Sequence, residues 1–174
     1  GAPMLSHHLA RALPSRRARV TVAAVAYLLF AAAVITSTLH REEENPLQTE
    51  AGFAQYYGRS ASRQFDFATA EGYFRTSIDY LHACGGEGDD TVEWYADAHE
   101  DLADALAAQG RLHEAAATHL RALHLYERAD GPRSGSCIDP LQELADIYSA
   151  TGRDSAAQAC TARVAEIQAI RAAT

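Results

Sequence analysis

A block of residues that recurs 42 positions further along constrains the fold of this chain more than any other feature. The first copy begins at Leu102 and the second at Leu144, and a Gly-Arg pair follows each, at 110–111 and at 152–153. The match resumes at 122–125 and 164–167. Apolar residues recur at helical spacing on both sides of the first Gly-Arg pair. The pattern predicts stacked pairs of helices, because a single pair cannot bury its apolar face alone.

These residues resemble the tetratricopeptide repeat, in the form of about 42 residues found in kinesin light chains. The similar stretch covers 102–132 and reads LADALAAQGRLHEAAATHLRALHLYERADGP. The resemblance places Gly110 in the turn between the two helices of a unit and puts small residues where the helices approach closely: Ala103, Ala115 and Ala122. It implies an all-α solenoid of antiparallel helix pairs, with units at about 51–84, 91–132 and 138–170. The resemblance is specific for the fold and not for the function.

The first unit departs from the pattern because it lacks the turn glycine. Its second helix is predicted from Phe67, Ala70 and Phe74, which recur at helical spacing. Its first helix is predicted over 53–63, with three aromatic residues as its apolar face: Phe53, Tyr56 and Tyr57. Two more aromatic residues are expected in the core at the junction of the first and second units, with an exposed interface anchor as the alternative: Trp94 and Tyr95.

Helix-breaking segments at 85–90 and 130–135 separate the units. Asp90 or Thr91 is predicted to cap the helix that follows the first segment. After the second segment, Asp139 is expected at the N-cap and Pro140 in the first turn.

A 20-residue stretch without charges, VTVAAVAYLLFAAAVITSTL, occupies 20–39. As a helix it would span about 30 Å, the hydrocarbon thickness of a bilayer. Five Arg and no acidic residue lie in 1–41, whereas the rest of the chain holds ten Arg and 23 acidic residues, a net charge of −13. The stretch is predicted to be a transmembrane helix, with the basic end on the matrix or cytoplasmic side. A signal peptide and a buried core helix are the alternatives.

The predicted organisation is a basic leader over 1–19, the transmembrane helix over 20–39, an acidic linker over 40–50 and the repeat domain over 51–174. Ala33 and Ser37 are small residues four positions apart, a spacing suited to close packing against another transmembrane helix. The Arg-rich, acid-free leader resembles a mitochondrial targeting segment. Because Gly1 is not methionine, the chain is expected to begin after processing or after a cloning remnant, and both stay open.

Motifs for chemistry are missing from the sequence. There is no phosphate loop, nucleophile motif or metal-ligand spacing, so no catalytic residue, cofactor, metal or small-molecule substrate is expected. An acidic body also lacks the basic footprint that nucleic acid requires. His82 and Cys84 are the one near-ligand pair, and we interpret them as ordinary side chains. Two states are open for the cysteines, which are free thiols or, in an oxidising compartment, a disulfide between Cys84 and Cys137.

The family resemblance implies that the first helix of each unit lies on the concave side of the solenoid. Six polar residues of the second and third units would then line an acidic groove suited to a basic helix or tail: Asp97, Glu100, Asp104, Asp139, Gln142 and Asp146. A solvated acidic face is the alternative interpretation.

These features together predict a non-catalytic scaffold held by a single-pass membrane anchor, in contact with lipid and with other protein subunits. The expected role is an accessory subunit or assembly factor of a mitochondrial inner-membrane complex, of the respiratory chain or ATP synthase. The N-terminus would lie in the matrix and the repeats in the intermembrane space. The alternative is a receptor in a bacterial inner membrane, whose periplasmic repeats bind a basic peptide or protein.

Overall fold

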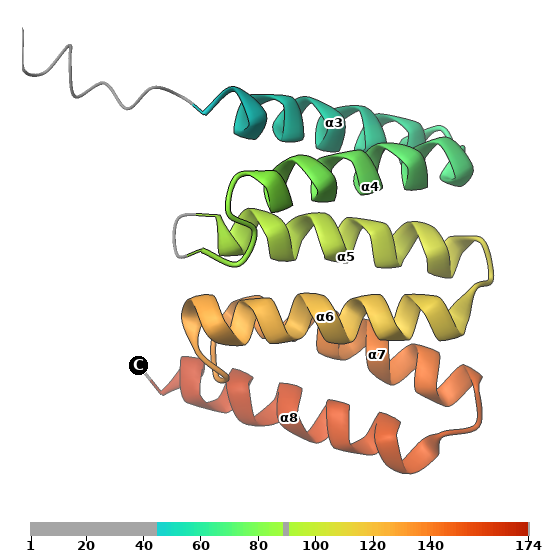
Figure 1. Ribbon diagram of the computed structural model, residues 1–174. Coiled ribbons are helices and arrows are strands. Elements are labelled where there is room, and N and C mark those ends of the chain that lie inside the picture. Colours follow the sequence, from blue (N-terminus) through green and yellow to red (C-terminus); the bar gives the residue numbers. More distant parts are fainter. Residues whose placement is uncertain (1–44, 89–90, 174) are drawn as a thin grey trace, which may run out of the picture. The chain divides into compact units, whose positions relative to one another are not determined.

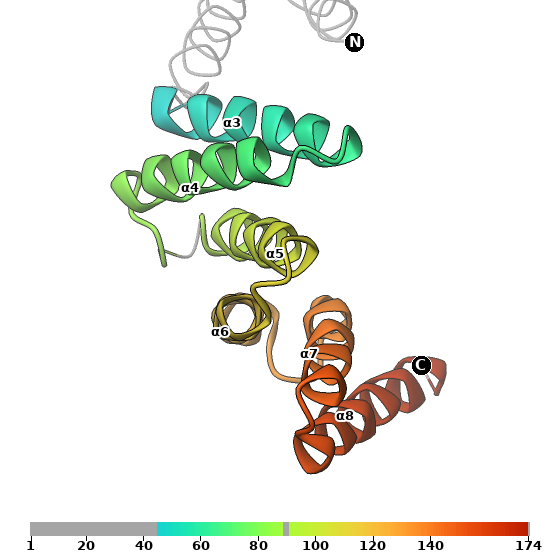
Figure 2. The ribbon, with the colours of Figure 1, turned by 90° about the vertical axis from the view of Figure 1, so that its right-hand side faces the viewer.

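Antiparallel pairs of helices follow one another along the described part of the chain, residues 45–88 and 91–173 of a computed structural model (Figure 1). The elements are α3 (Pro46–Arg63), α4 (Phe67–Ala83), α5 (Val92–Ala108), α6 (Leu112–Asp130), the short 3-10 helix η1 (Gly135–Cys137), α7 (Ile138–Ala150) and α8 (Asp154–Ala172). Each helix packs against the next (Figure 2). The core between them consists mostly of Ala and Leu. The prediction of an all-α repeat solenoid is confirmed.

A residue in the left-handed backbone conformation follows the first helix of each pair. Gly110 has φ +76° and Gly152 has φ +71°, conformations that glycine adopts without a steric penalty. The Arg111 N–H donates to the Leu106 carbonyl at 3.0 Å, the longer hydrogen bond of a Schellman cap. Phe65 takes the same position in the first pair, with φ +60°. An L-residue there costs about 1–2 kcal/mol, so the first turn is strained where the others are not.

Helix α3 begins earlier than the sequence predicts. The Asn45 side chain accepts a hydrogen bond from the Leu47 N–H at 3.1 Å, and Pro46 fills the first helical position, where a missing N–H costs nothing. Residues 46–50 are therefore the start of a helix, and the prediction of a linker over 40–50 is wrong for that part.

The predicted apolar face of α3 is also wrong. Its buried residues are small: Ala51, Ala54, Gly58 and Ala61. The three aromatic side chains assigned to the core are each more than half exposed: Phe53, Tyr56 and Tyr57. Small residues let α3 approach α4 closely, so that a Cβ placed on Gly58 would lie 2.5 Å from Cε1 of Phe74. The aromatic side chains are larger than this contact admits and lie on the other faces of the helix.

The helix starts at α5 and α7 differ from the predicted caps. Thr91 precedes α5, but its hydroxyl donates to the Gly86 carbonyl at 2.9 Å and no helix N–H bonds to it. Helix α7 begins at Ile138 after Cys137, which places Asp139 in the first turn and leaves Pro140 buried there. The predicted N-cap at Asp139 is therefore wrong by two positions, because η1 leads directly into α7. Asp90 lies outside the described residues.

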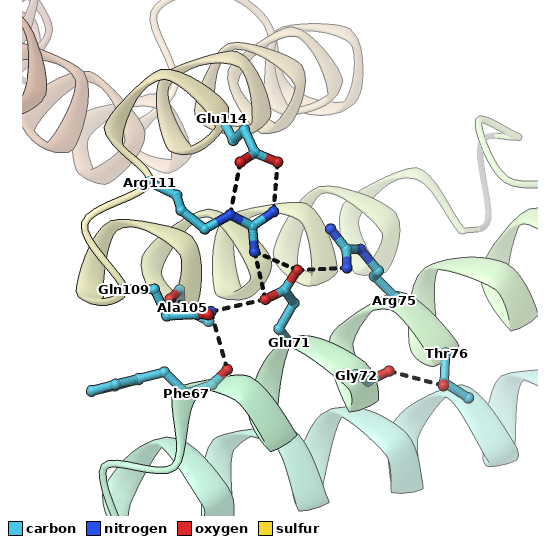
Figure 3. A network of polar contacts seen from close by, with 9 residues as sticks. All are labelled: Phe67, Glu71, Gly72, Arg75, Thr76, Ala105, Gln109, Arg111 and Glu114. Carbon is cyan, nitrogen blue, oxygen red and sulfur yellow. Dashed lines mark hydrogen bonds and ion pairs between the residues drawn. The ribbon is translucent and has the colours of Figure 1, made fainter.

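A buried carboxylate joins the first helix pair to the second (Figure 3). Glu71 of α4, whose side chain is 9% exposed, faces Nη1 of Arg111 at 2.8 Å from both carboxylate oxygens. Gln109 donates to it at 2.9 Å, and Arg75 lies 2.5 Å away on its own helix. The hydrogen bond from Gln109, followed by those from Arg111, outweighs burial and holds the pKa of Glu71 below its usual range. Arg111 also pairs with Glu114, so one guanidinium connects α4 to α6.

Residues 1–44 lie outside the described residues, and with them the predicted leader over 1–19, the predicted transmembrane helix over 20–39 with Ala33 and Ser37, and the first part of the predicted linker. None of the helices in 45–88 and 91–173 is both long enough and apolar enough to cross a membrane.

Candidate functional site

Two stripes of carboxylates face each other across the second and third units. On α5, Asp97, Glu100, Asp101 and Asp104 recur three or four residues apart, which places them on one side of the helix. On α7 the same spacing aligns three acids: Asp139, Glu143 and Asp146. We call these seven residues the acidic groove.

The charges of the groove act on one another. Removal from water raises the pKa of Glu100, and the nearby charges of Asp139 and Asp97 raise it further. The pKa of Glu143 on α7 is raised by burial and then by the charges of Asp146 and Asp139. Repulsion among like charges disfavours the ionised forms, so a cation entering the groove is bound more favourably than at an isolated carboxylate.

Asp104 has the largest shift in the groove. Partial removal from water is the main cause, and the charges of Glu143 and Glu100 add to it, raising the pKa of Asp104 to about 7. Its side chain is nevertheless 59% exposed. The Asp104 carboxylate is therefore accessible to a ligand and is poorly neutralised by the protein itself.

The first unit supplies partial compensation at one end of the groove. Arg59 of α3 donates to Asp101 at 2.8 Å, and the Gln55 side chain donates to the same carboxylate at 2.9 Å. Burial raises the pKa of Asp101, and the hydrogen bond from Gln55 and the Arg59 charge oppose that shift. Helices α3, α5 and α7 thus contribute side chains to one continuous polar surface.

An aromatic edge marks the other end of the groove. The Tyr126 hydroxyl of α6 lies 2.6 Å from carboxylate oxygens of both Asp97 and Glu100, so its single proton bonds to one of the two at a time. Trp94 is 50% exposed and lines a hollow together with these residues and Asp139. The prediction that Trp94 is a core residue is wrong, because its neighbour Tyr95 turns inward and fills that space.

The structure places all six residues predicted for the groove on α5 and α7, with Gln142 three positions after Asp139 and four before Asp146. Gln142 is exposed on α7 between the acids and makes no hydrogen bond that the described residues show. Asp101 and Glu143 were missed, although their spacing of three or four residues from acids already assigned to the groove would have identified them.

Two histidines of the second unit have buried ring nitrogens. His119 of α6 has no exposed surface, and His99 of α5 is half-buried, and neither side chain makes a hydrogen bond in the described structure. Burial lowers the pKa of each to about 4, so both are neutral near pH 7. Nε2 of His119 lies 3.5 Å from Oδ1 of Asp104. His119 reaches the groove from the helix beneath it, and no motif in the sequence indicates this.

Cys84, Cys137 and Cys160 are free thiols, which is one of the two states that the sequence leaves open. Cys84 ends α4, whereas Cys137 lies in η1 with its sulfur 3.7 Å from the Gly131 carbonyl. Cys84 lies at the start of the connection between the first and second units, and Cys137 lies at the end of the connection between the second and third. Burial raises the pKa of both thiols, which keeps them in the less reactive protonated form.

Comparison with known proteins agrees with this geometry. Residues 94–169 match the model of the tetratricopeptide repeat family. The chain resembles BtubC from P. vanneervenii with a TM-score of 0.64 and 21% identity, over 100% of this chain and 67% of that one. It resembles the TPR domain of Arabidopsis FLU with a TM-score of 0.62 and 19% identity, over 71% and 99%.

A third likeness is to a putative kinesin light chain from Podospora anserina with nearly identical TPR-like repeats. Its TM-score is 0.60 and its identity 19%, over 99% of this chain and 86% of that one. Identities this low show the fold alone. No curated protein sequence matches the chain. The described helices therefore have the fold of tetratricopeptide repeats, and residues 94–169 match that family.

Proposed function

We propose that this domain is a non-catalytic scaffold that binds a basic segment of a protein partner in the acidic groove. The observation that carries the proposal is the surplus of mutually repelling carboxylates on α5 and α7, of which Asp101 is neutralised by Arg59. Lys or Arg side chains of a ligand would relieve this repulsion and form charge-assisted hydrogen bonds. Trp94 offers an exposed ring at the groove edge, which a guanidinium can stack upon.

Charge reversal of Glu100 and Asp139 tests this proposal. We expect Glu100→Lys/Asp139→Lys to weaken binding of a fluorescein-labelled Arg-rich peptide at least tenfold, measured by fluorescence anisotropy with the full chain. Both residues lie on the hollow beside Trp94, so the variant puts two cations where the ligand cations would lie.

The matched control is Asp79→Lys/Asp154→Lys, which changes the net charge by the same amount on α4 and α8. Both control residues are exposed and lie on the second helix of their pairs, away from the groove. We expect this variant to bind the peptide within about twofold of the unaltered chain at physiological salt, where distant charges are screened. An equal loss in both variants would mean that the peptide responds to net charge alone, and the groove would not be a binding site.

We also propose that residues 20–39 anchor the scaffold in the mitochondrial inner membrane, as part of an accessory subunit or assembly factor of a membrane complex. The support is in the sequence: a charge-free stretch of 20 residues, an Arg-rich leader before it and an acidic body after it. A bacterial inner membrane with the repeats in the periplasm is the alternative, and it fits the same charge asymmetry.

Alkaline carbonate extraction of mitochondria from cells that express the full chain tests the anchor. We expect the chain to stay in the membrane pellet and Leu29→Arg to release it, because a charged residue at the centre of a bilayer costs at least about 2.5–3.5 kcal/mol. Release of the unaltered chain into the supernatant would contradict an anchor at 20–39. Protease protection then reports which side of the membrane holds the repeats.

A further inference from the structure

We infer that His119, Asp104 and Glu143 form a binding site for a divalent first-row transition-metal ion of the Zn²⁺ class. Asp104 lies on α5, His119 on α6 and Glu143 on α7. Fifteen positions separate the first two residues along the chain, and 24 separate the last two. Each offers one ligand atom, and these atoms lie within 4.8 Å of one another. The inference does not rest on peptide binding by the groove.

The geometry of His119 carries the inference. Its side chain has no exposed surface, and neither ring nitrogen has a hydrogen-bond partner. A buried polar group without a partner is unfavourable, and such a group in a native structure calls for an explanation. Its Nε2 is directed at Asp104, but the separation of 3.5 Å from Oδ1 gives no hydrogen bond. A metal ion between the two residues would accept the imidazole lone pair that the protein leaves unused.

The two carboxylates complete the arrangement from two other helices, α5 and α7. Asp104 and Glu143 are both exposed at the groove, so their side chains can rotate without disturbing the core. Ligand atoms at about 2.0–2.2 Å from a tetrahedral Zn²⁺ lie roughly 3.4 Å apart. Closing the observed spread to that value requires the carboxylate oxygens to move by about an ångström, which rotation of exposed side chains provides.

The donor set selects the class of ion. One imidazole nitrogen and two carboxylate oxygens suit Zn²⁺, Co²⁺ or Mn²⁺, whereas Mg²⁺ and Ca²⁺ are usually held by oxygen ligands alone. Three protein ligands leave a fourth position for water or for a side chain of a partner, as in open zinc sites. Among the described residues, this is the one group of three such ligands that lies close together.

Isothermal titration calorimetry of the full chain with Zn²⁺ as the only ligand tests the site. We expect Glu143→Gln to weaken Zn²⁺ binding at the proposed site at least tenfold. The substitution removes one metal ligand from an exposed position and does not affect the core. Asp146→Asn is the matched control, since it removes the same charge from the next acid on the same side of α7. We expect its affinity to stay within twofold of that of the unaltered chain.

A second variant examines the imidazole. His119→Leu replaces it with an apolar side chain of similar size, and we expect Zn²⁺ binding to fall at least tenfold while the far-ultraviolet circular dichroism stays unchanged. Co²⁺ absorption should lose its ligand-field bands in this variant and in Glu143→Gln, but keep them in Asp146→Asn. Equal weakening by Glu143→Gln and Asp146→Asn would show diffuse attraction to the acidic groove, and no change in any variant would show binding elsewhere; either result overturns the inference.

Discussion

Phe74→Ala is expected to lower the free energy of unfolding by about 3–5 kcal/mol, measured by urea denaturation of the full chain. Phe74 is 1% exposed and lies in the core between the first helix pair, against the backbone of Gly58. Its removal takes away the largest side chain that holds α3 on α4, and the small residues of α3 cannot fill the space. A short solenoid depends on each of its interfaces, since every unit contacts only its neighbours.

Tyr73→Ala is the matched control on the adjacent residue of α4. Tyr73 is 39% exposed, so we expect its loss to cost about 1 kcal/mol or less. Similar losses in the two variants would mean that Phe74 does not fill a tight core. Gly58→Ala supplies a second check, because its Cβ would lie 2.5 Å from the Phe74 ring. We expect Gly58→Ala to cost less in a Phe74→Leu background than in the unaltered chain, a coupling that distant sites do not show.

The sequence predicts the second and third units well because their turns have a residue with a specific conformational role. Gly110 and Gly152 adopt φ values that favour glycine, and they lie 42 positions apart. The equivalent residue of the first unit is Phe65, 45 positions before Gly110. Neither the glycine nor the spacing of 42 survives there, so pattern matching detects the first unit only through the apolar residues of α4.

Close packing explains the errors in the first helix. A search for apolar periodicity assigns the largest aromatic side chains to the core, but α3 packs through Ala54, Gly58 and Ala61. Small residues bury little area each and give a weak signal, although they determine how near two helices lie. The early start of α3 was hidden for a similar reason, since Asn45 and Pro46 follow an acidic run that suggested a linker.

The groove and the metal-ligand cluster differ in how far the sequence can predict them. Acids three or four residues apart share a helix face whatever the tertiary structure, so the stripe on α5 follows from spacing alone. The approach of Asp104, His119 and Glu143 depends on how α6 packs beneath α5 and α7. Searches for ligands at short spacing cannot find a site whose residues lie on three helices of two units.

Arg111→Met is expected to lower the free energy of unfolding by about 2–3 kcal/mol, less than the 3–5 kcal/mol typical of breaking a buried ion pair. The variant leaves the carboxylate of Glu71 buried but removes the guanidinium that faces both of its oxygens (Figure 3). Gln109 and Arg75 remain as partners, which is why part of the stabilisation persists. Urea denaturation followed by circular dichroism measures the loss.

Arg128→Met is the control for this prediction. Arg128 also pairs with a glutamate, Glu87, but both side chains are about 40% exposed, and we expect a cost of at most about 1 kcal/mol. The double variant Glu71→Leu/Arg111→Met should recover most of the loss, because it removes the buried charge together with its partner. If the double variant is no more stable than Arg111→Met, the loss does not come from leaving the Glu71 charge buried without its partner. Recovery would instead show that the loss in Arg111→Met comes from leaving the Glu71 carboxylate buried without its guanidinium.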